Sequence, residues 1–346
     1  MLDIEKQFPG VKALDHAKLQ LRPGSIHALM GENGAGKSTL MKCLFGIYKK
    51  DAGSIRMNGK EINFTSPRNA LDHGVAMVHQ ELNQVLYRSV MENMWLGRFP
   101  LKAGLVDHKK MYNDTKSVLD DLEIKVDPKT IIGTMAVSQR QMLEIAKAVS
   151  YNAKILVLDE PTSSLTSEEV EHLFRIMRRL CEQGVGIIYI SHKMPELFEI
   201  CDTYCVLRDG KLVAYGRFDG IDENGITEQM IGRQLADDDF SNHVCVAKEQ
   251  VAMSVKNLTG QGFTDISFDL HQGEILAITG LQGSGRDAVA DALFGVIPYT
   301  GTVVVNGKTM RPGSISGFMR NQVAMVPRMR KERGIHNDLS IYDNLY

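Results

Sequence analysis

The chain has 346 residues, with 40 lysines and arginines against 42 aspartates and glutamates, so its formal net charge is −2. Hydrophobic residues make up 43% and charged residues 24%, which is typical of globular proteins and excludes a disordered or fibrous chain. The length predicts two domains, the balanced charge predicts no nucleic-acid partner, and the apolar runs are too short for a membrane span.

A repeat with a period near 250 residues divides the chain. Residues 24–31 (GSIHALMG) align with residues 273–280 (GEILAITG) at an offset of 249, and shorter matches follow at nearly the same spacing. A period this long indicates a duplicated domain rather than a solenoid. The second copy stops opposite Trp95 of the first, so we expect it to be truncated. The predicted divisions are a first domain over 1–235, an acidic, turn-rich linker over 236–250 and a partial second domain over 251–346.

Short apolar runs alternate with helical periods in the first domain. Residues 26–30, 155–158 and 186–190 have the length and uniform apolar character of strands buried on both faces. Apolar side chains at i, i+3, i+4 and i+7 predict helices between them, one of which the capping box Thr166–Glu169 opens. This alternation predicts an α/β fold with a mainly parallel sheet. Residues 86–150 show helical patterns without strong strand signals, which predicts an inserted helical subdomain.

A glycine-rich segment follows the strand at 26–30. Gly31-Glu32-Asn33-Gly34-Ala35-Gly36-Lys37-Ser38 matches the pattern G-x-x-x-x-G-K-[ST] at every fixed position and leads, through Thr39, into a predicted helix over 39–45. Glycines let the backbone curl so that successive amides face a phosphate, and the helix N-terminus adds partial positive charge. Lys37 would contact the β- and γ-phosphates, and the Ser38 hydroxyl would bind Mg²⁺. The segment predicts a nucleotide site.

Four polar residues follow predicted strands at the edge of the sheet that carries this loop. Asp159 and Glu160 end one strand: Asp159 can hold the hydration shell of Mg²⁺, and Glu160 can position or deprotonate a water. His192 follows the strand at 186–190, where it can contact the γ-phosphate. Gln80 follows residues 75–78 and can offer its amide oxygen to Mg²⁺ or water. Because parallel strands end at one edge, we expect these side chains to meet there.

Phe8 is the candidate contact to the base of the nucleotide. It lies 29 residues before Lys37 and could stack on a purine. The alternative, an aromatic side chain in the core, remains open from the sequence alone.

These elements together resemble the ATP-binding-cassette (ABC) ATPases. In that family's terms the segment 31–38 is the Walker A loop, Gln80 the Q-loop, residues 158–160 the Walker B strand end, residues 164–166 the D-loop and His192 the H-loop. Longer stretches are similar to the tandem ATPase subunits of bacterial monosaccharide importers. They are FPGVKALD (8–15), HALMGENGAGKST (27–39), MVHQELN (77–83) and YISHKM (189–194).

The resemblance implies a P-loop NTPase cassette with an N-terminal antiparallel part and an inserted helical subdomain, followed by a partial second cassette. It implies ATP and Mg²⁺ as cofactors and an ATPase that drives monosaccharide import. The implied partners are membrane permease subunits, a periplasmic sugar-binding protein and a second cassette-bearing chain. The implied location is peripheral, on the cytoplasmic side of the bacterial inner membrane.

Two departures from the family pattern weaken these expectations. The signature loop falls on residues 135–139, where Ala136 replaces a serine that would contact the γ-phosphate of the opposing domain. Ser138 could instead cap a helix that begins near Gln139, which keeps Ala136, Ser138 and Gln139 as predicted nucleotide contacts. In the second copy, Arg286 and Asp287 stand where the loop needs lysine and a hydroxyl, so ordinary turnover there is not expected.

Three functional interpretations remain. The first is an ATPase subunit for sugar uptake, and the second is a vestigial or regulatory module that binds ATP but hydrolyses it poorly. The third, a tandem ATPase of the translation-factor kind, is disfavoured because those proteins have a long basic helical linker, whereas this one is short and acidic. A GTPase is disfavoured because no Asn-Lys-x-Asp motif occurs.

Overall fold

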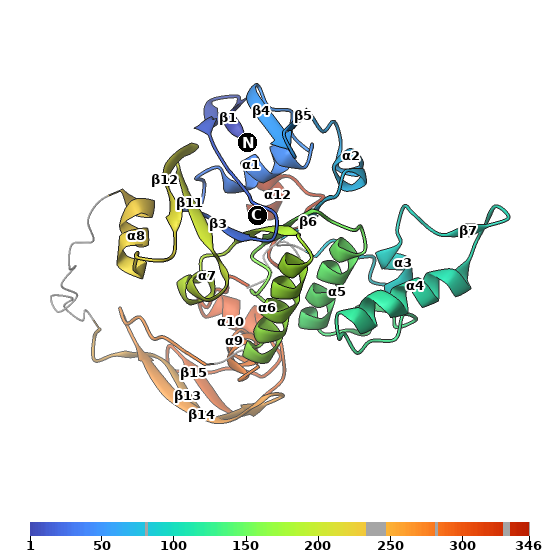
Figure 1. Cartoon of the computed structure of the whole chain (residues 1–346). Helices are drawn as coiled ribbons and strands as arrows, with labels where there is room; N and C mark the ends of the chain where they lie inside the picture. Colours follow the sequence, from blue (N-terminus) through green and yellow to red (C-terminus); the bar gives the residue numbers. More distant parts are fainter. Residues whose placement is uncertain (80–81, 233–246, 281–282, 328–332, 346) are drawn as a thin grey trace. The chain divides into compact units, whose positions relative to one another are not determined.

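The computed structural model describes residues 1–79, 82–232, 247–280, 283–327 and 333–345. The chain divides into two compact units, Met1–Asp238 and Asp239–Tyr346 (Figure 1). Residues 236–246 of the predicted linker lie outside the described residues. Within the described part of the chain, none of the helices combines the length and the apolar character that crossing a bilayer requires.

A six-stranded sheet forms the centre of the first unit. Its order is β12-β11-β3-β10-β9-β6, and all neighbouring strands are parallel except β11 and β12. All residues of β3 and β10 are buried, as expected for apolar strands in a sheet covered on both faces. The strands are β3 (Ile26–Met30), β6 (Val75–Val78), β9 (Ile155–Asp159), β10 (Gly186–Ile190), β11 (Thr203–Arg208) and β12 (Lys211–Arg217).

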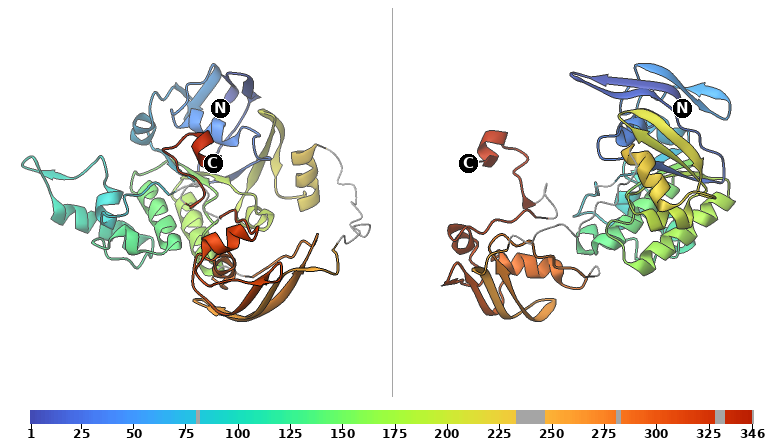
Figure 2. Two further views of the ribbon diagram at one scale, coloured as in Figure 1. Left: turned by 180° about the vertical axis from the view of Figure 1, so that it is seen from behind. Right: turned by 90° about the vertical axis from the view of Figure 1, so that its left-hand side faces the viewer.

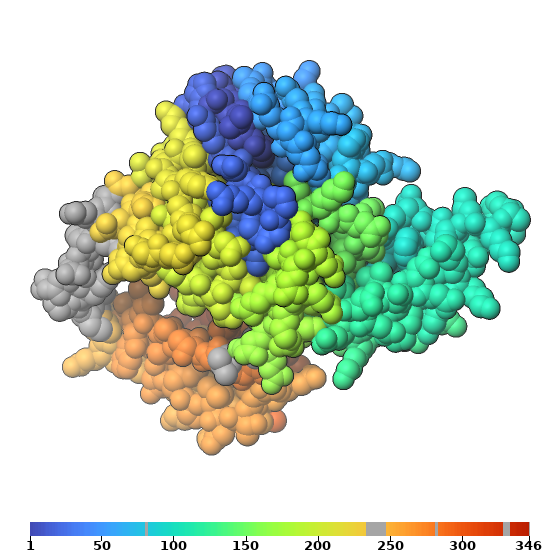
Figure 3. Space-filling view, viewed as in Figure 1, coloured from blue at the N-terminus to red at the C-terminus, as the bar shows by residue number. Residues whose placement is uncertain are grey.

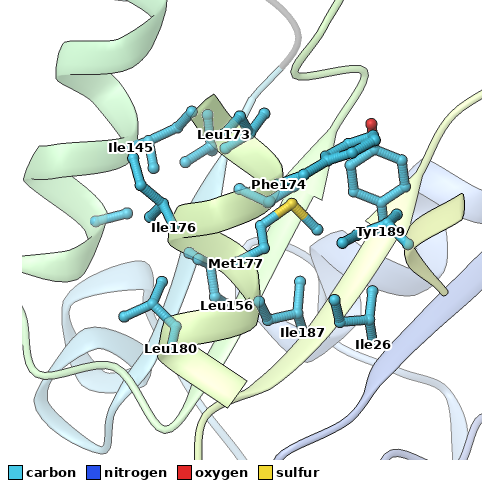
Figure 4. Close-up of a cluster of buried hydrophobic side chains, with 14 of the residues drawn as sticks. Ile26, Ile145, Leu156, Leu173, Phe174, Ile176, Met177, Leu180, Ile187 and Tyr189 are labelled. Atoms are coloured by element: carbon cyan, nitrogen blue, oxygen red, sulfur yellow. The ribbon is translucent and has the colours of Figure 1, made fainter. Parts of the chain in front are cut away.

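Helices pack on both faces of this sheet. On one face, Leu173, Phe174 and Met177 of α6 lie over Leu156 and Ile187 of the strands (Figure 4). The other face shares a buried cluster with α1. The helices of the first unit are α1 (Lys37–Leu44), α2 (Pro67–Asp72), α3 (Val90–Met94), α4 (His108–Asp121), the 3₁₀ helix η1 (Ile132–Thr134), α5 (Val137–Val149), α6 (Ser167–Glu182), α7 (Met194–Ile200) and α8 (Glu223–Ile231).

A second, antiparallel sheet has the order β2-β1-β4-β5. Two of its strands come before β3 in the sequence, and the other two lie between β3 and β6. Its strands are β1 (Leu2–Phe8), β2 (Val11–Ala17), β4 (Ala52–Met57) and β5 (Lys60–Ile62). Ile4, Leu14 and Ile55 belong to the same buried cluster as Leu40 of α1 and Ile188 of β10. The antiparallel sheet therefore packs over α1, the helix that follows the glycine-rich segment.

The region between β6 and β9 is mainly helical. It contains α3, α4, η1 and α5. The part around α3 and α4 projects from the rest of the first unit (Figures 2 and 3), whereas α5 shares the buried cluster of the central sheet. Ser89 caps α3 through a capping box with Glu92. A short hairpin of β7 (Leu101–Lys102) and β8 (Leu105–Val106) was not predicted, because paired strands of two residues are too short to show an alternating pattern.

The second unit contains an antiparallel sheet with the order β14-β13-β15-β16. Its elements are β13 (Val251–Gly260), β14 (Phe263–His271), β15 (Thr300–Val305), β16 (Lys308–Thr309), α9 (Arg286–Leu293), α10 (Ile315–Arg320) and α12 (Ile341–Leu345). Val255, Val289 and Phe318 join strands and helices in one buried cluster. Residues 274–280, which align with β3, form no strand, and Ile275 is 97% exposed.

Candidate functional site

A sharply curved loop, residues 31–36, joins β3 to α1. Gly31, Gly34 and Gly36 have positive φ angles of 142°, 88° and 100°. A Cβ atom on Gly36 would lie 2.7 Å from the carbonyl oxygen of Ala13, and one on Gly31 would overlap a backbone carbonyl of β11. Glycine is needed at both positions because the backbone conformation and the close neighbours leave no room for a side chain. Residues 32–34 are exposed, so the outer part of the loop is open to a ligand.

Helix α1 begins directly at the end of this loop. Its first residue is Lys37, two residues before the predicted start, so Ser38 and Thr39 lie in the first helical turn. Ala35 is buried, and its carbonyl oxygen accepts a hydrogen bond from the amide of Gly210 at 3.1 Å. The loop is therefore anchored to the turn between β11 and β12, with the positive end of the helix dipole at its base.

The Lys37 ammonium lies inside the curve of the loop. It donates hydrogen bonds to the carbonyl oxygens of Gly31 at 2.7 Å and Glu32 at 3.0 Å. Burial lowers the pKa of Lys37, while the negative charges of Glu160 and Asp159 oppose this shift. The two acids act on the ammonium because the end of β9 lies close to the loop. The structure thus brings Lys37, Asp159 and Glu160 together.

The two acids occupy different environments. Asp159 ends β9, and its pKa is raised by burial and, next, by the charge of Glu160. Glu160 has a φ of +50°, a left-handed conformation that is uncommon for residues other than glycine. The Glu160 amide donates a hydrogen bond to the carbonyl oxygen of Ile190 at 2.9 Å, which ties the turn after β9 to the end of β10.

His192 and Glu160 form a pair at the ends of neighbouring strands. His192 Nδ1 lies 2.9 Å from Glu160 Oε1. The Glu160 side chain is 13% exposed, whereas that of His192 is 75% exposed. The second carboxylate oxygen, Glu160 Oε2, is buried and has no hydrogen-bond partner among the described residues. A buried carboxylate oxygen can accept further bonds, so this atom has free capacity for a water or a metal ion.

Two other predicted site residues have less defined surroundings. Phe8 ends β1, and its ring meets the ring of Tyr48 edge-on with centroids 5.2 Å apart. It is only partly buried, so stacking on a base and packing against the protein both remain open. Gln80 lies outside the described residues. Its neighbour His79 matches no motif of the sequence, yet it lies near enough to Asp159 to act to lower the pKa of that carboxyl.

The segment 135–139 adopts a different helix start from the one predicted. Helix α5 begins at Val137, with Ala136 at the N-cap position and no side-chain cap. The prediction that Ser138 caps the helix is therefore wrong, because Ser138 is already inside the first turn. Gln139 Oε1 accepts a hydrogen bond from the Ala136 amide at 3.2 Å. This contact favours a helix start before Gln139. Among the described residues, no hydrogen bond or ion pair joins residues 136–139 to the loop at 31–38.

The second glycine-rich segment, residues 280–287, repeats part of the local geometry. Gly283 and Gly285 have φ angles of 84° and 91°, close to those of Gly34 and Gly36. Arg286 begins α9 and donates to the carbonyl oxygen of Gly280 at 3.0 Å, as Lys37 does to Gly31. Its guanidinium also lies 3.7 Å from the carboxylate of Asp287. Residues 281–282 lie outside the described residues.

Comparison with known proteins identifies the family of the chain. A family model described as ABC transporter matches residues 14–163 and 263–344 of the chain. The chain belongs to the ABC transporter family. The match includes both glycine-rich segments of this ABC chain, and the prediction of a cassette-type α/β fold is confirmed.

Curated relatives of the ABC chain cover almost all of it. The Galactose/methyl galactoside import ATP-binding protein of Fusobacterium nucleatum is 51% identical over 99% of this chain and 69% of its own length. The protein of the same name from Salmonella typhimurium is 52% identical over 99% of this chain and 68% of its own length. The resemblance to sugar-importer ATPases that the motifs indicated is thus confirmed.

Solved structures show the same fold at low sequence identity. A nucleotide-free ATP-binding cassette from an ABC transporter is 23% identical and covers 67% of this chain and 93% of its own, with a TM-score of 0.57. The dimeric post-hydrolysis state of the cassette MJ0796 bound to ADP and Pi is 19% identical and covers 64% and 98%, with a TM-score of 0.55. These likenesses extend to the fold alone.

Proposed function

We propose that this chain is the ATP-binding and ATP-hydrolysing subunit of an importer for a monosaccharide of the galactose or methyl-galactoside type. The observation that carries this proposal is the convergence of Lys37, Asp159, Glu160 and His192 at one edge of the central sheet. The names of relatives that are 51–52% identical over 99% of the chain support the sugar class.

The site offers distinct chemical groups for each part of the reaction. The loop amides and the Lys37 ammonium bind the triphosphate, and the Ser38 hydroxyl and the Asp159 carboxylate are hard oxygen ligands that suit Mg²⁺. A bound Mg²⁺ would neutralise charge on the phosphates. Glu160 then positions or deprotonates the attacking water, a role worth about 10²–10⁴ in rate, and His192 contacts the γ-phosphate. Gln80 belongs to the same proposed metal and water site.

The remaining nucleotide contacts in this proposal come from the rest of the loop and from a second cassette. Phe8 would stack on the base, and residues 136–139 would face the nucleotide of an opposing cassette. We propose a second cassette-bearing chain, membrane permease subunits and a periplasmic sugar-binding protein as partners. The proposed location is peripheral, at the cytoplasmic face of a bacterial inner membrane.

A second candidate function is a module that binds ATP but hydrolyses it slowly. Two observations favour it over robust turnover by an isolated chain. Ala136 offers no hydroxyl at the N-terminus of α5, and Asp287 puts a carboxylate where the second loop would need a hydroxyl. The two candidates share the same nucleotide site and differ only in the rate of the chemical step.

The test measures binding and hydrolysis of Mg-ATP by the purified chain. Lys37→Ala removes the cation inside the loop and should lower ATP affinity by about 100-fold, since charge-assisted phosphate contacts contribute about 1.5–3 kcal/mol each. Lys49→Ala, which removes an exposed lysine beyond the same helix, is the control and should leave affinity unchanged. Unchanged affinity in Lys37→Ala would overturn the proposed site. A turnover number near zero with intact binding, also in the presence of a second cassette-bearing chain and the permease subunits, would select the second candidate.

A further inference from the structure

A second carboxylate, Glu196, lies four residues after His192 on α7. Its Oε2 atom accepts hydrogen bonds from Thr162 Oγ1 at 2.7 Å, from the Tyr189 hydroxyl at 2.9 Å and from Ser191 Oγ at 3.5 Å. Its Oε1 atom accepts a hydrogen bond from the Lys193 ammonium at 2.9 Å. One carboxylate therefore gathers four donors, and nothing in the motifs of the sequence singles it out.

The donors come from the two segments that carry the Glu160–His192 pair. Thr162 lies two residues after Glu160, whereas Ser191 and Lys193 flank His192 on both sides. The Lys193 ammonium also donates to the carbonyl oxygen of Thr162 at 3.3 Å and to its hydroxyl at 3.2 Å, so the two segments are linked twice. Glu196 is thus the common partner of the turn after β9 and the turn after β10.

Apart from Lys193, whose side chain is 39% exposed, this network is largely shielded from solvent. Thr162, Tyr189 and Ser191 are all buried, and the Glu196 side chain is 12% exposed. Burial and the negative charge of Glu196 raise the pKa of the Tyr189 phenol, which keeps that hydroxyl protonated as a donor. The bonds from Thr162, Tyr189 and Lys193 to the Glu196 carboxylate are 2.7–2.9 Å long, so this part of the network resists rearrangement of the two turns.

We propose that Glu196 is a positioning residue for ATP hydrolysis, whose carboxylate holds the two turns so that His192 Nδ1 meets Glu160 Oε1. This inference rests on the proposed function, because it assigns Glu196 to the same reaction. Glu196 makes no hydrogen bond or ion pair with the loop at 31–38 in the described residues. Its effect is therefore on the chemical step rather than on the affinity for nucleotide.

The first experiment compares Glu196→Ala and Glu196→Gln in the full chain. The alanine variant should lower kcat by about 10- to 100-fold with the Kd for Mg-ATP unchanged, because a small misplacement of reacting groups has this cost. The glutamine variant should lose less, since its amide oxygen still accepts bonds from the hydroxyls but no longer pairs with Lys193. Glu199→Gln, an exposed glutamate on the same helix, is the matched control.

A double-mutant cycle shows whether Glu196 acts through His192. In a His192→Ala background, Glu196→Ala should cause little further loss of kcat, because the group that it positions is already gone. A loss as large as in the wild-type background would overturn the proposal. So would an equal fall in kcat and nucleotide affinity, which would indicate general damage to the fold.

A spectroscopic measurement keeps this test independent of turnover. In chain labelled with ¹³C in the histidine ring, the His192 signal is assigned by its loss in His192→Ala. The chemical shift of that signal should change in Glu196→Ala and stay the same in Glu199→Gln. An unchanged chemical shift in Glu196→Ala would overturn the proposal. If the wild-type chain binds no ATP, the proposed function is wrong. The chemical shift of His192 still shows in that case whether Glu196 positions the imidazole.

Discussion

The two glycine-rich segments of the chain share a backbone shape but differ in the acids and strands beside it. In both, glycines adopt left-handed conformations, a helix begins at the cationic residue, and that cation donates to the first carbonyl oxygen of the loop. Around Lys37, two acids and a histidine stand at the ends of neighbouring strands. Arg286 instead lies 3.7 Å from the carboxylate of Asp287, its neighbour in the first turn of α9.

The difference arises from partners that are distant in sequence. β3 is a strand because β10 and β11 pair with it on both sides, through residues that lie more than 150 positions later. The similar apolar run at 274–280 forms no strand among the described residues, and Ile275 is exposed. A curled loop is thus a local property of glycine, whereas a phosphate site also needs the sheet that brings acids to the loop.

Exchanging the residues that distinguish the two loops should have the largest effect on ATP binding. Lys37→Arg/Ser38→Asp gives the first loop the chemistry of the second and should weaken ATP binding by about 10³-fold, or about 4 kcal/mol, because a carboxylate then faces the phosphates. The reverse exchange, Arg286→Lys/Asp287→Ser, should create no second site. Titration calorimetry checks both, and a stoichiometry of two in the reverse variant would contradict the role given to the sheet.

The central strands and the first loop could be predicted from the sequence. β3 and β10 have the predicted bounds because short, wholly apolar runs between turns admit few other structures. The capping box at Thr166 marks the start of α6 for a local reason, since the cap and the Glu169 side chain satisfy each other's backbone amides. The carboxyl ends of β9 and β10 then place Glu160 beside His192.

Features that depend on side chains from several segments could not be predicted. The early start of α5 follows from the contact of Gln139 with Ala136, which competes with a cap from Ser138. The convergence of donors on Glu196 requires the β9 and β10 turns to be neighbours, which no spacing in the sequence reveals. The roles of Phe8 and Gln80 stay predictions.

The two units should also differ in how acid affects their stability. His27 of β3 is buried between Thr203, which it contacts at 2.8 Å, and the stacked ring of Tyr215, and burial lowers its pKa from 6.5 to about 4. Between these pH values the unfolded chain binds a proton that the folded chain excludes, so the first unit loses stability as the pH falls. The loss is about 3 kcal/mol at pH 4.

The counterpart of His27 in the second unit is Leu276, which cannot titrate. His27→Leu should therefore flatten the decrease in the free energy of unfolding of the first unit between pH 6.5 and 4. Denaturant titrations across this range measure the change. Thr203→Val removes the hydrogen bond to His27 but leaves the ionisable ring in place, so the pH dependence of the free energy of unfolding should be unchanged. If wild type and His27→Leu show the same pH dependence, His27 is not the cause of the acid sensitivity.

A smaller effect should be common to both units. Gly36→Ala and Gly285→Ala each place a Cβ against a backbone carbonyl oxygen in a left-handed conformation, and each should destabilise its unit by about 2 kcal/mol. Gly34→Ala, where no atom lies near the added Cβ, should lose only about 1 kcal/mol from the backbone strain. Hydrogen exchange at α1 and α9 reports each unit separately. A cost at Gly36 alone would show that the second loop does not hold its curled shape in solution.

The last and smallest change in stability concerns helix α5 of the first unit. Ser89, Asp107 and Thr166 cap their helices with side-chain oxygens, whereas the N-cap of α5 is Ala136 and has no such acceptor. Ala136→Ser should therefore raise the melting temperature by the equivalent of about 1 kcal/mol, because the hydroxyl can accept from the free amide in the first turn. Val137→Ser puts the same hydroxyl inside the helix, where it cannot cap, and should give no gain. An equal gain in both variants would show that the added hydroxyl does not act as a cap. A gain in neither would show that the Gln139 contact already stabilises this end of the helix.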